Sequence, residues 1–559
     1  MFASLRQLSD EQKRDLRMAL ALMLAATVCY APGITWGMPD AVTGERTKAW
    51  GVDEIAPMGP LFETRNLFLH GPLGNPQYPM FHYILVFVCY LPYLGLQMLT
   101  GGLAHPHAGH PYGFTDVTAS VQMLLLIARS VSVLMAGGTL VAVYFLAKEL
   151  WGRAAGVCAA LCMLSLYPMF YYGKTSNVDM PAIFWTSIGL ALFVRVLRDG
   201  LSPRRAVWLG LWAALAIAAK DASYGTFLLL PIPILMAHFR ELNAQGRTSL
   251  RDRWLAPAIG LGVAAVVYGF ASGLFIYPRK FFWHLQFVRA GNPSGGFYFE
   301  YEPTVAGYAA LLRECLEHLT TFLGWPLLLL AAGGVLFCAA RDRRALWLLL
   351  PILALFVLVL MPVRFVQLRF VFPWALVLAC FAGRAVAAAW QAGPRPVGWV
   401  VAAVALFGGT YNLGRGADLA RTMYRDSRYE AAAWLNAQMQ TGQRLEIFGE
   451  PMRMRHFPLL RDGVGLVVSE VKPQPGNGRL VGDFVMLTGD DLGRSRMCPR
   501  WVRDGLFDGS LGYHKAAEFQ SPSYWPHSRE FTVNPRVVFF QRRAGRDSAG
   551  ARESNKLSP

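Results

Sequence analysis

The sequence has few charged residues for its length. Charged side chains make up 16% of its 559 residues, whereas soluble domains carry about 25%. Apolar residues make up 54% and gather in runs such as 183–194, 346–361 and 370–382. Such runs are typical of membrane-spanning helices, which need about 20 mostly apolar residues. The composition therefore excludes an ordinary soluble protein and predicts a polytopic membrane protein.

Acidic residues are also scarce. The chain has 36 Asp and Glu against 53 Lys and Arg, and its net charge is +17. In a soluble protein this excess would suggest nucleic-acid binding. Here the arginines gather in short gaps between apolar runs, as they do in loops that face the cytoplasm. We therefore expect no nucleic-acid partner.

Several sequence motifs are absent. The eight cysteines contain no CxxC pair and no zinc-binding spacing. No GxGxxG motif or P-loop occurs, so no nucleotide-binding domain is expected. The polar residues 1–17 precede an apolar run without a clear small-residue cleavage site, which indicates a retained first helix rather than a signal peptide. An internal repeat, which many transporters have, is not found either.

Hydropathy predicts an all-α membrane domain with about eleven spanning helices. Loops on the side of the N-terminal tail carry more Arg and Lys than the opposite loops, so we expect a cytoplasmic N-terminus. A span at 79–100 would reverse this pattern, so we expect an interfacial or re-entrant helix there, inside a large external loop over 37–118. The predicted spans are 17–36, 119–146, 154–172, 179–197, 206–219, 222–239, 255–277, 319–340, 345–361, 368–389 and 397–412.

The composition turns polar after residue 412. A helix is predicted over 429–439, and short strand-like runs separated by Gly, Pro and Asp follow it at 444–448, 465–468, 483–487 and 536–541. This pattern indicates a small soluble α/β domain on the external side. The expected parts are a cytoplasmic tail (1–16), the transmembrane domain (17–412), the external α/β domain (413–543) and a disordered tail (544–559).

Acidic residues near the predicted membrane boundaries are candidates for chemistry. Asp53 and Glu54 are adjacent and follow the first predicted span. Such an acid is either a solvated loop residue or a general base that removes a proton from a hydroxyl. Asp179 stands at the start of a predicted helix, in a tight external turn, where it either caps the helix or belongs to a site.

Basic residues stand at or inside apolar runs. Arg129 lies within the run 123–134, Lys220 ends a helix, and Arg364 and Arg369 flank an external turn. A charge near the hydrocarbon costs about 2.5–3.5 kcal/mol on insertion scales, so it usually has a partner or a task. Each of these residues either snorkels to the headgroups or helps to form a phosphate site at one membrane face.

Three histidines form an HxHxxH pattern in a stretch rich in Gly and Pro. His105, His107 and His110 have ligand-like spacing for a metal ion. Asp116 is the nearby carboxylate, and we interpret the stretch as a plain loop. The sequence identifies no cofactor with certainty and leaves a divalent metal ion as an open alternative.

Five segments occur together in an order that resembles the GT-C membrane glycosyltransferases. The resemblance is to bacterial phospholipid-carrier-dependent enzymes related to protein O-mannosyltransferases and aminoarabinose transferases, and it covers roughly residues 15–415. Met80 and Gln77 depart from the family, which has a second Pro and a preceding Lys there. The segments are Asp53-Glu54, YPMFHY at 78–83 (like YPPLYYW), a helix from ARS at 128–130 to AKELWGR at 147–153, NVDMPA at 177–182 (like TDxP) and LRFVFP at 368–373 (like RYxLP).

The resemblance implies inverting transfer of a sugar from a polyprenyl-phosphate carrier to a hydroxyl acceptor on the external face. The sugar is hexosyl or pentosyl, and the acceptor stays open among protein, lipid A and glycan. The partners are then this donor and membrane lipid. The implied site residues are Asp53 and Glu54 as catalytic groups, Arg129, Lys220 and Arg369 as ligands of the donor phosphate, and Asp179, Tyr78 and His82 as residues that bind the acceptor or orient the reacting groups.

The resemblance also implies a location in a multi-pass plasma membrane, the bacterial inner membrane, with the C-terminal domain in the periplasm. Three alternatives stay open. One is a GT-C polymerase or ligase with a diphosphate-linked donor. The others are a lipid or sugar transporter and a noncatalytic scaffold in which Asp53 is incidental.

Overall fold

The computed structural model describes residues 9–75, 77–290, 299–392, 395–448, 451–469, 480–492 and 498–543. The chain divides into two compact units. The helical unit contains Met1–Thr35 and Asp53–Ala417, and the sheet unit contains Trp36–Val52 and Asp418–Pro559. The predicted disordered tail at 544–559 lies outside the described residues.

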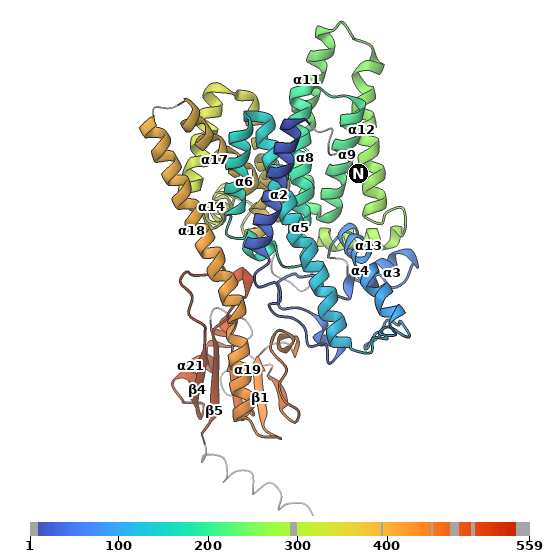
Figure 1. Ribbon diagram of the computed structural model, residues 1–559. Helices are drawn as coiled ribbons and strands as arrows, with labels where there is room; N and C mark the ends of the chain where they lie inside the picture. Colours follow the sequence, from blue (N-terminus) through green and yellow to red (C-terminus); the bar gives the residue numbers. More distant parts are fainter. Residues whose placement is uncertain are drawn as a thin grey trace, which may run out of the picture. The chain divides into compact units, whose positions relative to one another are not determined.

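The helical unit is built from long α-helices, in which α2, α6 and α8 pack against α5 (Figure 1). Its helices are α2 (Asp10–Tyr30), α3 (Gly59–Phe68), α4 (Phe81–Leu99), α5 (Val117–Trp151), α6 (Arg153–Leu164), α7 (Met169–Tyr172), α8 (Asp179–Asp199), α9 (Pro203–Ala219), α10 (Tyr224–Phe227), α11 (Pro231–Ala244), α12 (Leu250–Ala271), α13 (Pro278–Ala290), α14 (Val305–Arg341), α15 (Leu350–Leu355), α16 (Met361–Val363), α17 (Phe372–Ala392) and α18 (Arg395–Tyr424), the last of which continues into the sheet unit.

Nine helical segments in the described part of the chain are long and apolar enough to cross a membrane. The chain is therefore a multi-pass membrane protein, with nine such segments rather than the expected eleven or so. The predicted span 154–172 is divided between α6 and α7, where Pro168 precedes the second helix. The N-terminal helix α2 begins with charged turns that include Asp10 and Glu11, and α9 has 17 residues.

Helix α4 is one of the nine segments by length and composition. It contains Pro92 and packs against α3 and α5. Figure 1 shows α4 beside α3. The interfacial or re-entrant placement of 79–100 stays a prediction.

Close packing around α17 depends on glycines in α17 itself and in its neighbour α14. A Cβ atom added to Gly334 of α14 would lie 2.0 Å from the carbonyl oxygen of Phe381 in α17. A Cβ atom on Gly383 of α17 would lie 2.3 Å from the backbone nitrogen of Ala159 in α6. Small residues let membrane helices approach closely, and backbone atoms cannot move aside as a flexible side chain can.

The sheet unit contains, within the described residues, a five-stranded sheet in the order β2-β1-β3-β5-β4. Strand β1 pairs in parallel with β2 and β3, whereas β5 pairs antiparallel with β3 and β4. Its strands are β1 (Arg444–Phe448), β2 (Gly465–Ser469), β3 (Phe484–Leu487), β4 (Tyr513–Phe519) and β5 (Val537–Arg542), and its helices are α19 (Ser427–Gln438), α20 (Gly489–Leu492) and α21 (Arg500–Phe507).

The two faces of this sheet are covered by different helices. Alternate strand residues such as Leu445 and Phe539 form a core with Leu435 of α19. The intervening residues, such as Phe540, form a second core with Leu506 of α21. This confirms the predicted C-terminal α/β domain. The sequence did not predict β4, because this edge strand is largely exposed and carries polar residues.

The glycine packing leads to a stability prediction with a neighbouring control. Replacing Gly334 by Ala should lower the melting temperature of the detergent-solubilised protein, because overpacking typically costs about 1–3 kcal/mol. The control is Gly333→Ala in the same helix, where an added Cβ meets no atom within 4 Å. Ala is the better helix former by about 0.5–1 kcal/mol, so the control should be neutral or stabilising. Equal melting of the two variants would contradict the packing argument.

Candidate functional site

Asp53 lies in a loop and is the first residue of the second chain segment of the helical unit, Asp53–Ala417. The Asp53 carboxylate forms an ion pair with Arg369, and Oδ2 lies 2.5 Å from Nη2 of the guanidinium. Arg369 belongs to the 3₁₀ helix η5 (Leu368–Val371), which leads into α17. The Asp53 side chain is 27% exposed and the Arg369 side chain 12%. The structure thus holds Asp53 from one side while a part of its carboxylate stays accessible.

The neighbouring Glu54 forms a different kind of pair. Its two carboxylate oxygens accept hydrogen bonds from Nε and Nη2 of Arg129 at 2.7 and 2.8 Å, and both side chains are 1% exposed. The backbone N–H of Ser176 also donates to Glu54, at 2.9 Å, and Arg129 donates to the carbonyl of Ile34 at 2.6 Å. This buried, bidentate pair ties the loop to α5 and to the turn before α8.

The third pair joins Asp179 to Lys220. Lys220 is the residue that follows α9, and its ammonium group donates to the carboxylate of Asp179 at the start of α8. The backbone N–H groups of Asp179 and Met180 donate to Oδ1 of Asn177, at 3.0 and 3.4 Å. The N-cap residue of α8 is Val178, and Asp179 is the first helical residue. The alternative in which Asp179 caps the helix is therefore wrong, and its carboxylate binds Lys220 instead.

The Asp53–Arg369 and Asp179–Lys220 pairs lie next to each other. The Lys220 ammonium and the Arg369 guanidinium lie 5.1 and 5.8 Å from the centre of the same ring, that of Phe370. Tyr78 is coupled to this group: burial and the Asp53 carboxylate raise the pKa of Tyr78 well above its ordinary value. Its phenol therefore stays protonated and can donate a hydrogen bond. Sequence segments far apart thus converge on one acidic and basic cluster.

His82 is not joined to this cluster by a hydrogen bond. It lies in α4, is 1% exposed, and neither of its ring nitrogens has a hydrogen-bond partner in the part of the chain that the structure describes. His105, His107 and His110 are exposed. Among the described residues, no group of three His, Cys, Asp or Glu side chains is placed to hold a metal ion.

The sequence did not single out a further buried pair close to Tyr78. Lys280 of α13 lies 2.5 Å from Glu63 of α3 and also donates to the carbonyl of Leu73 at 2.5 Å. Lys280 and Tyr78 line one small cleft, together with Ser272. Glu63 and Lys280 lie more than two hundred positions apart in the chain, so no local pattern indicates that they meet.

The buried position of the Glu54–Arg129 pair leads to a prediction. Glu54→Gln leaves Arg129 buried without its counter-charge, which typically costs about 3–5 kcal/mol. The variant should therefore melt at a clearly lower temperature in detergent. Lys13→Gln is the control, because its ion pair with Asp10 at 3.6 Å is solvent-exposed and should contribute about 0–1 kcal/mol. Equal melting temperatures for the two variants would contradict the structural role of Glu54.

A sequence comparison with protein families matches residues 117–270 to the family described as Dolichyl-phosphate-mannose-protein mannosyltransferase. The matched segment begins with α5 and reaches into α12, so it contains Arg129, Asp179 and Lys220. No curated protein matches the sequence at the significance threshold.

Three solved structures show distant likeness to this chain. The oligosaccharyltransferase of Archaeoglobus fulgidus in complex with Zn and sulfate is 15% identical, with a TM-score of 0.45 over 75% of this chain and 55% of that chain. ArnT from Cupriavidus metallidurans bound to undecaprenyl phosphate is 14% identical, with a TM-score of 0.40 over 94% and 97%. Arabinofuranosyltransferase AftD from Mycobacteria is 16% identical, with a TM-score of 0.41 over 97% and 42%.

This chain spans about half the length of the oligosaccharyltransferase, and no residue role is carried over at these TM-scores. The match over 117–270 contains two of the five segments described above, the helix from 128 to 153 and the turn at 177–182. The resemblance inferred from the sequence is thus confirmed, and this multi-pass chain is similar to the membrane glycosyltransferases of the GT-C type that use lipid-phosphate carriers.

Proposed function

We propose that this chain is an inverting membrane glycosyltransferase that moves a sugar from a polyprenyl phosphate to a hydroxyl acceptor on the external face. One observation carries the proposal most directly. A partly exposed carboxylate, Asp53, lies beside two adjacent cations, Arg369 and Lys220. A base and a phosphate site within one cluster are what this transfer requires.

The exposed fractions distinguish the carboxylates of the site. Asp53 is 27% exposed, whereas Glu54 is 1% and Asp179 is 3% exposed. An acceptor hydroxyl must reach the base within hydrogen-bond distance, so Asp53 is the base in this proposal. Its backbone also has a φ of 54°, a strained value for a residue other than glycine. Such strain is often found at functional sites.

The reaction then proceeds as follows. The Asp53 carboxylate accepts the proton of the acceptor hydroxyl while the acceptor oxygen forms a bond to the anomeric carbon. The bond between that carbon and the phosphate oxygen breaks on the opposite side, and its electron pair leaves with the lipid phosphate. Attack opposite to the leaving group inverts the anomeric configuration. Asp53 afterwards releases its proton to water.

The cations divide into two roles. Lys220 and Arg369 are assigned to the lipid phosphate, where preplaced positive charge stabilises the leaving group. Each is held in position by a carboxylate, Asp179 and Asp53 respectively. Arg129 was expected at the phosphate, but its guanidinium binds Glu54 and the Ile34 carbonyl. We therefore assign Arg129 and Glu54 to holding the loop.

Tyr78 and His82 differ in the structural evidence for an orienting role. Tyr78 is electrostatically coupled to Asp53 and Arg369, and its protonated phenol is assigned to the acceptor or to the phosphate. Neither ring nitrogen of His82 has a hydrogen-bond partner among the described residues, so its assignment to acceptor orientation rests on the motif resemblance alone. The external position of the site follows from the cytoplasmic N-terminus inferred from the loop charges.

The proposal is tested by sugar transfer in membranes that contain the full chain and a panel of polyprenyl-phosphate hexoses and pentoses. Asp53→Asn should lower kcat by about 10²-fold or more, because it removes the general base but keeps the side-chain shape. Asp116→Asn is the control. It changes an external-loop acid that caps α5, and Asn caps a helix equally well, so activity should be retained.

The donor panel also separates the alternatives. Transfer from a monophosphate-linked sugar with release of lipid phosphate supports the proposal. Transfer only from a diphosphate-linked donor would support the polymerase or ligase alternative instead. Equal turnover by the wild type and Asp53→Asn would show that Asp53 is not the base.

A further inference from the structure

Helix α13 of the helical unit comes shortly after α12, one of the nine segments that can cross a membrane. Helix α12 ends at Ala271 and α13 begins at Pro278. Figure 1 shows that α13 turns away from the direction of α12. The proposed reaction uses no residue of α13. Its sequence, PRKFFWHLQFVRA, nevertheless combines basic, aromatic and apolar side chains in a regular order.

One face of α13 packs against the protein. Lys280 and His284 are one helical turn apart on this face, and both are buried. Lys280 binds Glu63 of α3, and Nε2 of His284 lies 3.0 Å from Oδ2 of Asp221. Both residues also line the small cleft that Tyr78 lines. This face therefore joins α13 to α3 and to the segment that follows α9.

The contact of His284 with Asp221 is important because Asp221 directly follows Lys220. The ammonium of Lys220 belongs to the proposed phosphate site, whereas the carboxylate of Asp221 lies against α13. The same division occurs at the adjacent acids Asp53 and Glu54. The first of these is the proposed base, and the second ties the chain to a neighbouring helix. Asp221 thus stands to Lys220 as Glu54 stands to Asp53.

A second face of α13 is apolar. Phe281, Leu285 and Val288 follow one another at spacings of four and three residues, so they lie on the same side of the helix. The ring centre of Phe281 lies 6.1 Å from that of Tyr268, which is near the end of α12. Leu285 and Val288 are exposed. This apolar side therefore continues the surface of α12, most of which is not covered by other helices.

The remaining side of α13 is largely polar. Arg279, Gln286 and Arg289 are exposed there, together with Phe282. Trp283 is exposed between this side and the face that packs against the protein. Amphipathic helices with basic polar sides lie in the plane of the membrane interface, where tryptophan is enriched at the level of the headgroups. The pattern of α13 therefore fits the surface of a lipid bilayer.

We propose that α13 binds the external surface of the bilayer and positions Lys220 from there, through the contact between His284 and Asp221. His284 and Asp221 are then positioning residues for the transfer reaction, and this part of the inference rests on the proposed function. A displacement of about 1 Å in a group at the reacting centre can lower the rate about 10²-fold. Holding the neighbour of Lys220 therefore affects how well the ammonium meets the leaving phosphate.

The positioning role is tested in membranes that contain the full chain, with the same panel of polyprenyl-phosphate donors. His284→Gln and Asp221→Asn should each lower kcat by about 10-fold to 10²-fold, because Lys220 is then less well placed. The control is His238→Gln in α11. His238 is as deeply buried as His284 and contacts the carbonyl of Arg253 at 3.2 Å. It reports the general cost of losing a buried histidine and should leave kcat unchanged.

A double variant distinguishes positioning from general damage. If Asp221 acts through Lys220, adding Asp221→Asn to Lys220→Gln should cause no further loss of kcat, because the two changes remove the same contribution. A loss that is fully additive would overturn the positioning role. The same conclusion follows if both single variants retain the wild-type kcat, or if His238→Gln lowers kcat as much as His284→Gln does.

The bilayer contact is measured without turnover. Leu285→Cys and Gln286→Cys place a thiol on the apolar and on the polar side of α13, at two positions that are both exposed in the protein itself. In spheroplasts that express the full chain, a membrane-impermeant maleimide should label position 286 at least about 10-fold faster than position 285, because lipid shields the apolar side of an interfacial helix. Mass spectrometry separates these sites from the eight native cysteines. Equal rates, or no labelling of position 286, would contradict the bilayer contact.

The failure of this inference and that of the proposed function are distinguishable. If the labelling contrast is found but the wild type transfers no sugar from any donor, the proposed function fails while the bilayer contact of α13 stands. If sugar is transferred but His284→Gln and Asp221→Asn retain the wild-type kcat, the positioning role fails while the proposed function stands.

Discussion

Charges that leave water need partners, and this requirement links the loop at residues 53–54 to the helices around it. Arg129 pairs with Glu54, Arg369 pairs with Asp53, and Lys220 after the end of α9 pairs with Asp179 at the start of α8. In each pair the partners come from distant parts of the chain. Each pair therefore acts as a cross-link between segments that hydrophobic packing alone would leave free to slide. Breaking a buried pair is costly, because the remaining charge stays in an apolar environment.

The carboxylate–arginine pairs differ in solvent exposure, and they have different roles for that reason. Glu54 and Arg129 are almost completely buried and fully hydrogen-bonded, so an incoming anion has little opportunity to displace either partner. Asp53 and Arg369 are partly exposed. There a phosphate can compete for the cation, and a hydroxyl can reach the carboxylate. Burial, rather than residue type, thus separates the residues that hold the loop from those assigned to the reaction.

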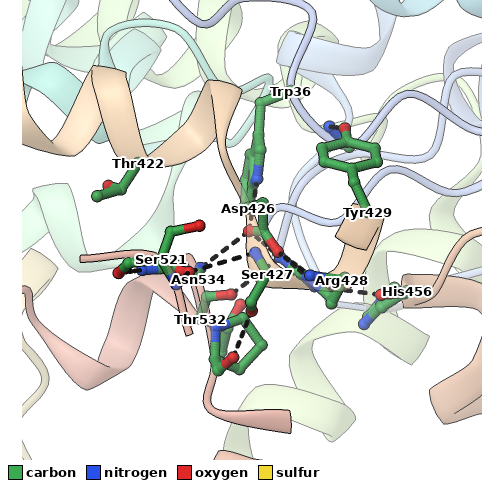
Figure 2. Close-up of polar contacts among 12 residues, drawn as sticks. Trp36, Thr422, Asp426, Ser427, Arg428, Tyr429, His456, Ser521, Thr532 and Asn534 are labelled. Atoms are coloured by element: carbon green, nitrogen blue, oxygen red, sulfur yellow. Dashed lines mark hydrogen bonds and ion pairs between the residues drawn. The ribbon is translucent and has the colours of Figure 1, made fainter. Parts of the chain in front are cut away.

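Each of the two units contains a buried carboxylate–arginine pair that anchors a loop. In the helical unit, Glu54 binds Arg129 and Ser176. In the sheet unit, Trp36 contacts the buried Asp426–Arg428 pair (Figure 2), as does Trp50. Both anchors use a carboxylate and an arginine that are removed from water, which gives them a preferred geometry. Asp53, next to Glu54 in the helical unit, has a left-handed backbone conformation.

Hydropathy and alternation are local properties that follow directly from the side chains, so the sequence was enough to predict the class of protein, the order of the motifs and most of the sheet strands. It also indicated which charged residues need an explanation. It could not determine which partner each one takes. Glu54 and Arg129 are 75 positions apart, and Trp36 and Asp426 are 390 apart. The folded chain, by contrast, decided that Asp179 pairs with Lys220, that Arg129 is buried in a pair with Glu54 and that 36–52 belongs to the sheet unit, because these outcomes depend on which distant segments pack together.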